Sequence, residues 1–88
     1  MFCVKYNPRK TYLKFLNEIK MAQYYVSKFP QANGTYEVHV AGCSHIPAEE
    51  NRLFLGDYLT CYPAVAVAQE IYKHSTGCFY CADACHID

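Results

Sequence analysis

Cysteine and histidine are the residues of this sequence whose types and spacing could do chemistry, and they are unevenly distributed. All four His and five of the six Cys lie from residue 39 onward. Two pairs have the short spacing of metal ligands, His39-x3-Cys43 and Cys78-x2-Cys81. A Cys-x2-Cys turn places two thiolates on one side of a tight loop, about 2.3 Å from a shared Zn²⁺. We therefore predict that His39, Cys43, Cys78 and Cys81 bind one structural zinc ion.

Other Cys and His residues leave the ligand set open. His45, Cys85 and His86 each lie close enough in sequence to replace one of the four predicted ligands. Cys3 and Cys61 are expected to be small core residues, because Cys is among the most buried residue types. The first five residues contain one Lys and no long apolar run, so we expect no secretory signal, a cytoplasmic protein and reduced thiols.

Several short motifs around these ligands carry a family resemblance. They are Tyr36-x2-His39-x3-Cys43, Glu50-Asn51-Arg52-x-Phe54, the alanines at 64, 66 and 68, and Cys78-x2-Cys81. Over about residues 35–82 the chain resembles the zinc-binding domain of the Ada-type DNA methylphosphotriester repair proteins and its wider relatives. The resemblance implies that His39 and Cys43 take the place of the family's first ligand pair, and Cys78 and Cys81 that of its second.

Two departures from the family pattern argue against its activity here. The methyl acceptor of the family is a zinc-bound cysteine of the first pair, and here the leading position is His39. A neutral imidazole whose lone pair is committed to the metal is not expected to accept a methyl group. The family's basic DNA contacts near the closing pair are also absent, since Phe79 and Tyr80 lie between Cys78 and Cys81. DNA binding by this half is therefore disfavoured.

The elements that must position the ligands can be read from apolar spacing. Residues 7–29 are predicted to form a long amphipathic helix, because apolar residues recur three or four positions apart and Pro8 and Pro30 suit its two ends. Asn33-Gly34 predicts a tight turn before a strand over 35–40. A second strand is expected over 52–56. An alanine-rich helix over 64–72, capped by Thr60, should follow it.

Length and composition indicate one small α+β domain, residues 1–88, with the zinc module over 35–86. The chain has 88 residues, of which 52% are hydrophobic. A domain of this size has a thin core and usually needs an added constraint. The predicted architecture is the long helix on a short antiparallel sheet, followed by the second helix and a C-terminal zinc knuckle. The longest apolar run, residues 61–68, is far shorter than the roughly 18 residues that cross a membrane.

Charge and aromatic content bear on a binding role. Residues 1–30 carry a net charge of +5 and residues 31–88 a net charge of −5. This asymmetry suggests either a basic arm that meets an anionic partner or two segments that attract each other within the fold. The nine Tyr and five Phe exceed what a small core needs, so we expect some of them on the surface. An unidentified protein partner is the first hypothesis, with Lys10, Lys14, Tyr24 and Tyr25 as contact residues and Tyr62 and Tyr80 as further exposed candidates. The alternative is a nucleic acid bound by the basic helix and the tyrosines.

An enzyme is the least favoured class. No Gly-rich phosphate loop, His-Glu-x-x-His or Gly-x-Ser-x-Gly motif occurs in the sequence. Glu49 and Glu50 are adjacent carboxylates, but neighbouring residues on an extended loop point apart. A catalytic zinc needs an open coordination position, and seven Cys and His residues near the site make one improbable. The sequence therefore predicts a non-enzymatic zinc module.

Overall fold

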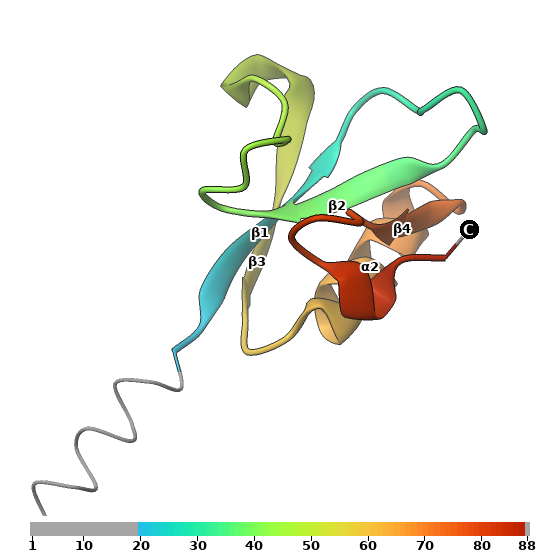
Figure 1. Ribbon diagram of the computed structural model, residues 1–88. Coiled ribbons are helices and arrows are strands. Elements are labelled where there is room, and N and C mark those ends of the chain that lie inside the picture. The colour runs from blue at the N-terminus through green and yellow to red at the C-terminus, as the bar shows by residue number, and fades with distance from the viewer. Residues whose placement is uncertain (1–19, 88) are drawn as a thin grey trace, which may run out of the picture.

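The computed structural model describes residues 20–87, which form a four-stranded sheet with one α-helix against it (Figure 1). The strand order is β3-β1-β2-β4. The elements are β1 (Ala22–Ser27), β2 (Tyr36–Val40), the 3-10 helix η1 (Glu49–Asn51), β3 (Arg52–Tyr58), α2 (Cys61–Ile71), β4 (Ser75–Gly77) and the 3-10 helix η2 (Asp83–Cys85). Within residues 20–87 no helix is long and apolar enough to cross a membrane.

The predicted long N-terminal helix over residues 7–29 is wrong. Residues 22–27 form β1, and residues 7–19 lie outside the part of the chain that the structure describes. Tyr24 and Val26 are buried while Tyr25 and Ser27 are partly exposed, which is the two-residue alternation of a strand. β1 pairs with β2 on one side and β3 on the other. This pairing outweighs the helical spacing of the apolar residues, because tertiary context overrides local propensity.

The sheet is mixed, which corrects the predicted antiparallel sheet. β1 runs antiparallel to both β2 and β3, whereas β2 and β4 are parallel. Parallel neighbours need a long crossover connection, and here β3 and α2 lie between β2 and β4 in the chain. The parallel pair brings the ends of β2 and β4 together at one edge of the sheet, which positions the site described below.

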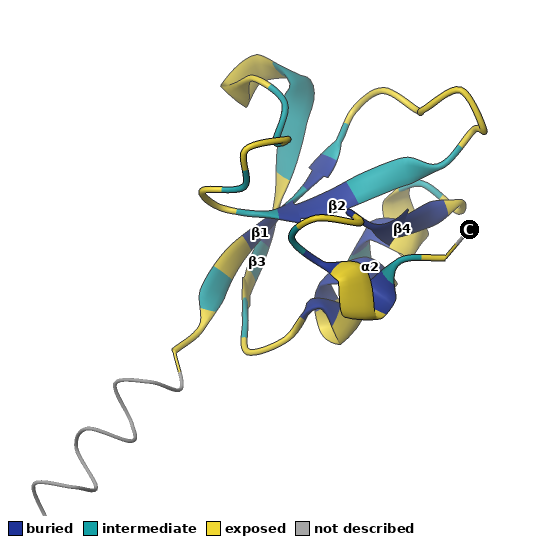
Figure 2. Ribbon diagram, in the orientation of Figure 1, coloured by how far each residue is buried: buried dark blue, intermediate teal, exposed yellow. Residues whose placement is uncertain are grey.

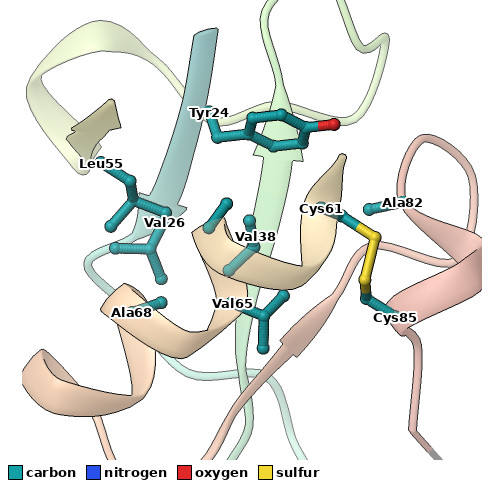
Figure 3. Close-up of a cluster of buried hydrophobic side chains, with 10 residues drawn as sticks. Tyr24, Val26, Val38, Leu55, Cys61, Val65, Ala68, Ala82 and Cys85 are labelled. Atoms are coloured by element: carbon teal, nitrogen blue, oxygen red, sulfur yellow. A yellow bond between two sulfur atoms is a disulfide. The ribbon is translucent and has the colours of Figure 1, made fainter. Parts of the chain in front are cut away.

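α2 covers one face of the sheet and forms the core with it (Figure 2). Its Ala64 and Ala68 are fully buried, so the helix backbone approaches the strands closely. Val26 and Val38 are also fully buried on the sheet, in the same core cluster as Ala64 and Ala68 (Figure 3). The predicted alanine-rich helix is therefore present, and its Ala64 and Ala68 face the sheet. Thr60 precedes it as predicted, but its side chain makes no capping hydrogen bond.

The two predicted strands are present with shifted ends. β2 covers five residues of the strand predicted over 35–40, and β3 extends two residues beyond the one predicted over 52–56. The predicted turn before β2 also forms, with Gly34 at φ 86°. Asn33 fixes this turn, because its side-chain oxygen accepts a hydrogen bond from the Thr35 N–H at 3.1 Å.

Cys61 and Cys85 form a disulfide, which corrects the expectation of reduced thiols throughout. The bond joins the first residue of α2 to η2 across 24 positions of sequence, with Cα atoms 6.3 Å apart (Figure 3). Cys61 is buried, as expected, but as half of a cross-link. The pairing also removes Cys85 from the set of alternative metal ligands.

Candidate metal centre

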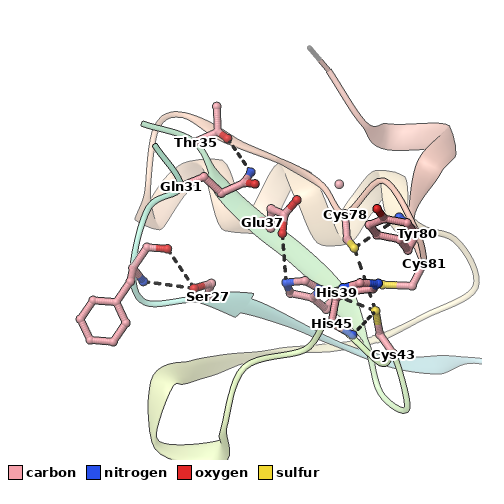
Figure 4. A network of polar contacts seen from close by, with 12 residues as sticks. Ser27, Gln31, Thr35, Glu37, His39, Cys43, His45, Cys78, Tyr80 and Cys81 are labelled. Atoms are coloured by element: carbon pink, nitrogen blue, oxygen red, sulfur yellow. Dashed lines mark hydrogen bonds and ion pairs between the residues drawn. The ribbon is translucent and has the colours of Figure 1, made fainter. Parts of the chain in front are cut away.

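Strand register brings the two predicted ligand pairs together. Val38 of β2 pairs with Gly77 of β4. The next residue on each strand is a predicted ligand, His39 on β2 and Cys78 after β4. The Cys78 N–H donates to the Val38 carbonyl at 2.9 Å, which locks this register. The parallel pair thus places an imidazole and a thiol side by side, although they are far apart in sequence (Figure 4).

Two tight turns supply the remaining ligands. After β2 the chain turns through Gly42 at φ 89°, and the Cys43 N–H donates to the Val40 carbonyl at 3.1 Å. This turn returns Cys43 to His39. After β4 the Ala82 N–H donates to the Cys78 carbonyl at 2.8 Å and closes the knuckle, residues 78–81. Both turns point their sulfur atoms into the same space.

The four predicted ligands, His39, Cys43, Cys78 and Cys81, have donor atoms that all lie within 4.8 Å of one another. The Cys43 sulfur is 3.7 Å from His39 Nδ1 and 4.0 Å from the Cys78 sulfur, and the Cys81 sulfur is 3.9 Å from His39 Nδ1. Sulfur ligands about 2.3 Å from a tetrahedral zinc ion are themselves about 3.8 Å apart. The four donors are therefore spaced to hold a single ion of that size.

Each sulfur also receives a backbone hydrogen bond. The N–H groups of Val40, His45 and Tyr80 donate to the sulfurs of Cys81, Cys43 and Cys78, each at 3.4 Å. Donors of this kind stabilise the negative charge of a thiolate. The backbone around the cluster is thus arranged for the form of cysteine that binds metals.

His39 is held in the orientation that a metal ligand needs. Its Nδ1 faces the sulfurs of Cys43 and Cys81, while its Nε2 lies 3.6 Å from a carboxylate oxygen of Glu37. The side chain is only 2% exposed. Burial, and then the neighbouring charge of His45, lower the pKa of His39 to about 4. At neutral pH the ring is therefore uncharged, which leaves a lone pair on Nδ1 for a metal.

The thiols are crowded in a way that a cation would relieve. Burial raises the pKa of Cys81 well above the ordinary value for a thiol, and hydrogen bonding to Cys43 raises it further. Without a cation, several thiolates this close together would repel one another. A bound divalent ion reverses this preference, because it deprotonates its thiol ligands outright. Three thiols and one imidazole this close together are thus more readily explained as ligands of a zinc ion than as a polar cluster without a metal.

Gly77 and Glu37 shape the site, although neither is among the ligands predicted from the sequence. A Cβ at Gly77 would collide with the Ala82 carbonyl oxygen and lie 2.8 Å from the Cys85 Cβ. Gly77 therefore lets residues 82–85, which follow the knuckle, pack closely against β4. Its signal in the sequence is its position directly before Cys78. The signal of Glu37 is its place two residues before His39, on the same face of a strand.

The other predicted residues lie elsewhere. His45 is exposed and stacks on Tyr80 at 3.9 Å, and His86 Nδ1 lies 2.9 Å from the Gly77 carbonyl oxygen. Neither belongs to the four-donor cluster. Tyr24 is only 7% exposed and is a core residue, which corrects its expected place on a surface for a partner. Tyr25 is partly exposed beneath the Arg52 guanidinium at 4.7 Å. Lys10 and Lys14 lie outside the described residues.

No family model, curated protein or solved structure matches this chain. The likeness to the Ada-type zinc domains therefore depends on the residues and their spacing alone. The function has to be argued from the site itself.

Proposed function

We propose that this protein is a small zinc module whose metal has a structural role and whose surface binds another protein. The observation that carries the proposal is the convergence of His39, Cys43, Cys78 and Cys81 within 4.8 Å. Three thiolates and one imidazole are soft and borderline donors that favour Zn²⁺ over Mg²⁺ or Ca²⁺. The ion would join β2 to the segment after β4. β4 has only three residues, so its own pairing with β2 is short.

The number of donors supports a structural over a catalytic role. Four protein ligands complete a tetrahedron and leave no position for water or substrate. The sulfurs are also engaged by backbone N–H groups, and His39 is almost fully buried. A small domain gains folding free energy directly from such a site.

The surface supports a protein partner over a nucleic acid. Residues 20–87 contain four Lys or Arg and six Asp or Glu, so this part of the chain has no excess of cations to neutralise phosphates. Tyr62 and Tyr80 are 63% and 68% exposed. Exposed tyrosines are typical of protein interfaces. Lys10 and Lys14, on which the nucleic-acid alternative depends, lie outside the described residues.

Elemental analysis of the purified full chain tests the metal directly. We expect one zinc per chain in the wild type. We expect Cys81→Ser to lose most of that zinc, because a hydroxyl is a poor zinc ligand. Ser44→Ala is the matched control, since Ser44 is exposed beside Cys43 but is not one of the four donors. A wild-type protein that is folded and free of metal would overturn the proposal.

A further inference from the structure

A strip of aromatic and apolar side chains, most of them exposed, runs from His45 across the knuckle to α2. It begins with His45, which stacks on Tyr80 with ring centres 3.9 Å apart. Tyr80 contacts Phe79 edge to face at 5.2 Å, and Phe79 contacts His86 at 5.5 Å. The strip then reaches a surface hollow whose lining includes His86, Ile87, Tyr62, Val65 and Ala66. We call these residues the aromatic strip.

The exposure of the strip is concentrated in four large side chains. Tyr62, Phe79, Tyr80 and Ile87 are between 58% and 68% exposed. Single exposed apolar residues are normal, but a contiguous set linked by ring contacts marks an interaction site. Tyr and Phe supply large contact area with few rotatable bonds, so ordering them on binding costs little entropy.

The size of the hollow indicates what fits there. Its volume is about 240 Å³. Pockets for drug-sized molecules and cofactors usually begin at about 300 Å³. The hollow is therefore suited to one or two apolar side chains of a partner. Its wall is firm, because the Cys61–Cys85 disulfide ties η2 to the start of α2.

Charge selects the kind of partner. The segments that form the strip, residues 43–45, 61–69 and 77–87, contain Asp83 as their single charged residue apart from histidines. A zinc ion with three thiolates and one neutral imidazole adds a net charge of −1 beneath it. Aromatic faces attract Lys and Arg side chains. The strip is thus apolar and mildly anionic, with no Lys or Arg to repel a basic partner.

From these observations we propose that the aromatic strip binds an extended protein segment that carries an aliphatic residue flanked by Lys or Arg. The aliphatic side chain occupies the hollow, and the cationic side chains lie over Phe79, Tyr80 and Asp83. This inference rests on the proposed function, of which it names the partner class. A nucleic acid is disfavoured, because the strip offers no cation to phosphate.

Selection from a phage-displayed library of random short peptides on the zinc-loaded full chain tests the inference. We expect enrichment of sequences with a Leu, Ile or Met flanked by Lys or Arg. Tyr62→Ser and Phe79→Ser should each weaken binding of an enriched peptide by about tenfold or more, the loss typical of an interface hot spot. Phe29→Ser is the matched control, since Phe29 is 62% exposed outside the strip. Asp83→Lys should weaken the same peptide without loss of zinc.

Three outcomes would overturn the inference. The first is that the selection enriches acidic peptides or enriches no peptide sequence. The second is that Phe79→Ser leaves the affinity for the enriched peptide unchanged. The third is concentration-dependent dimerisation that Tyr62→Ser or Phe79→Ser abolishes, which would assign the strip to a second copy of this chain. Zinc content measured on the same samples separates the two proposals. A chain that holds zinc but selects no basic peptide contradicts the partner class alone, whereas a chain without zinc contradicts the proposed function.

Discussion

His39 is fixed at both ring nitrogens, and this arrangement gives Glu37 a role at the scale of a single residue. Nε2 faces the Glu37 carboxylate at 3.6 Å while Nδ1 faces the sulfurs. A carboxylate beside the distal nitrogen of a histidine ligand favours the tautomer that leaves the other nitrogen free to bind metal, and it makes that nitrogen more basic. Glu37 is therefore a positioning residue for the metal centre.

Replacing Glu37 with Gln should weaken zinc binding about tenfold, the lower end of the effect of losing such a partner. Competition with a chromophoric chelator measures the affinity. Glu50→Gln, at an exposed position in η1, serves as the control and should change nothing. Equal affinities for wild type and Glu37→Gln would show that Glu37 is only a neighbour of the ring.

Gly77 and Gly34 are glycines for different reasons, and the difference can be measured. Gly77→Ala should cost roughly 1–3 kcal/mol of stability, because a Cβ there collides with the carbonyl oxygen of Ala82, directly after the knuckle, and with Cys85. Gly34→Ala meets no atom within 4 Å but must adopt φ 86°, at a cost of about 1–2 kcal/mol.

Urea denaturation and zinc content distinguish the two glycine variants. Gly77→Ala should lose zinc affinity as well as stability, whereas Gly34→Ala should keep its zinc. Full zinc affinity in Gly77→Ala would mean that the knuckle can move away from β4 without disturbing the donors.

Elements marked by a pattern in their own residues could be predicted from the sequence. Elements that depend on pairing with distant strands could not. Asn33-Gly34 and the alternation of apolar and polar residues after it predict β2, and the alanines predict α2. The short strand β1 has the same alternation, but its apolar residues also fit a helical spacing, and only its two partner strands decide the matter. β4 is three residues long, too short to show a period. Its parallel pairing with β2 is a non-local event that no spacing reveals.

The site shows the same division between local and non-local information. Each ligand pair is close in sequence and was recognised from its spacing, and the structure brings the two pairs together. The disulfide could not be predicted, because Cys61 and Cys85 are 24 residues apart and neither stands in a motif. Tyr24 was misplaced because its burial depends on the strand pairing of β1.

The disulfide between α2 and η2 should contribute about 2–4 kcal/mol to stability, since it closes a loop of 24 residues. Cys61→Ser and Cys85→Ser should each lower the free energy of unfolding by that amount, and the double variant should lose no more than either single one. Urea denaturation with and without a dithiol reductant measures this. The double variant is the control, because the reductant should not affect its stability. Full additivity of the two substitutions would mean that the residues act separately.

For the molecule as a whole, the metal should decide whether the domain folds. Most residues of the buried core are small, such as Ala64, Ala68, Val26 and Val38, so apolar burial alone gives a modest stability. Zinc binding in small domains is worth on the order of 10 kcal/mol at neutral pH. Removing the ion should therefore unfold the sheet and α2 in one cooperative transition.

Circular dichroism before and after treatment with a strong chelator checks this prediction. The melting midpoint should fall by tens of degrees, if a folded transition remains at all, and added Zn²⁺ should restore it. The double variant without the Cys61–Cys85 disulfide should lose more of its melting temperature on zinc removal than the wild type does. An unchanged melting curve after verified metal removal would contradict the structural role of the ion.

The segment from Gly77 to Ile87 is tied to α2 by the bond from Cys85 to Cys61, and a metal ion held by the knuckle cysteines would attach it to β2 as well. Reductants and oxidants act on different ones of these two attachments. A dithiol reductant would open the Cys61–Cys85 bond, whereas a strong oxidant would convert the thiolates of Cys43, Cys78 and Cys81 to sulfenic acids or disulfides, which could no longer hold a zinc ion. With zinc bound, both attachments would persist together only within an intermediate range of redox potential, and we expect the wall of the hollow beside α2 to be complete only in that range.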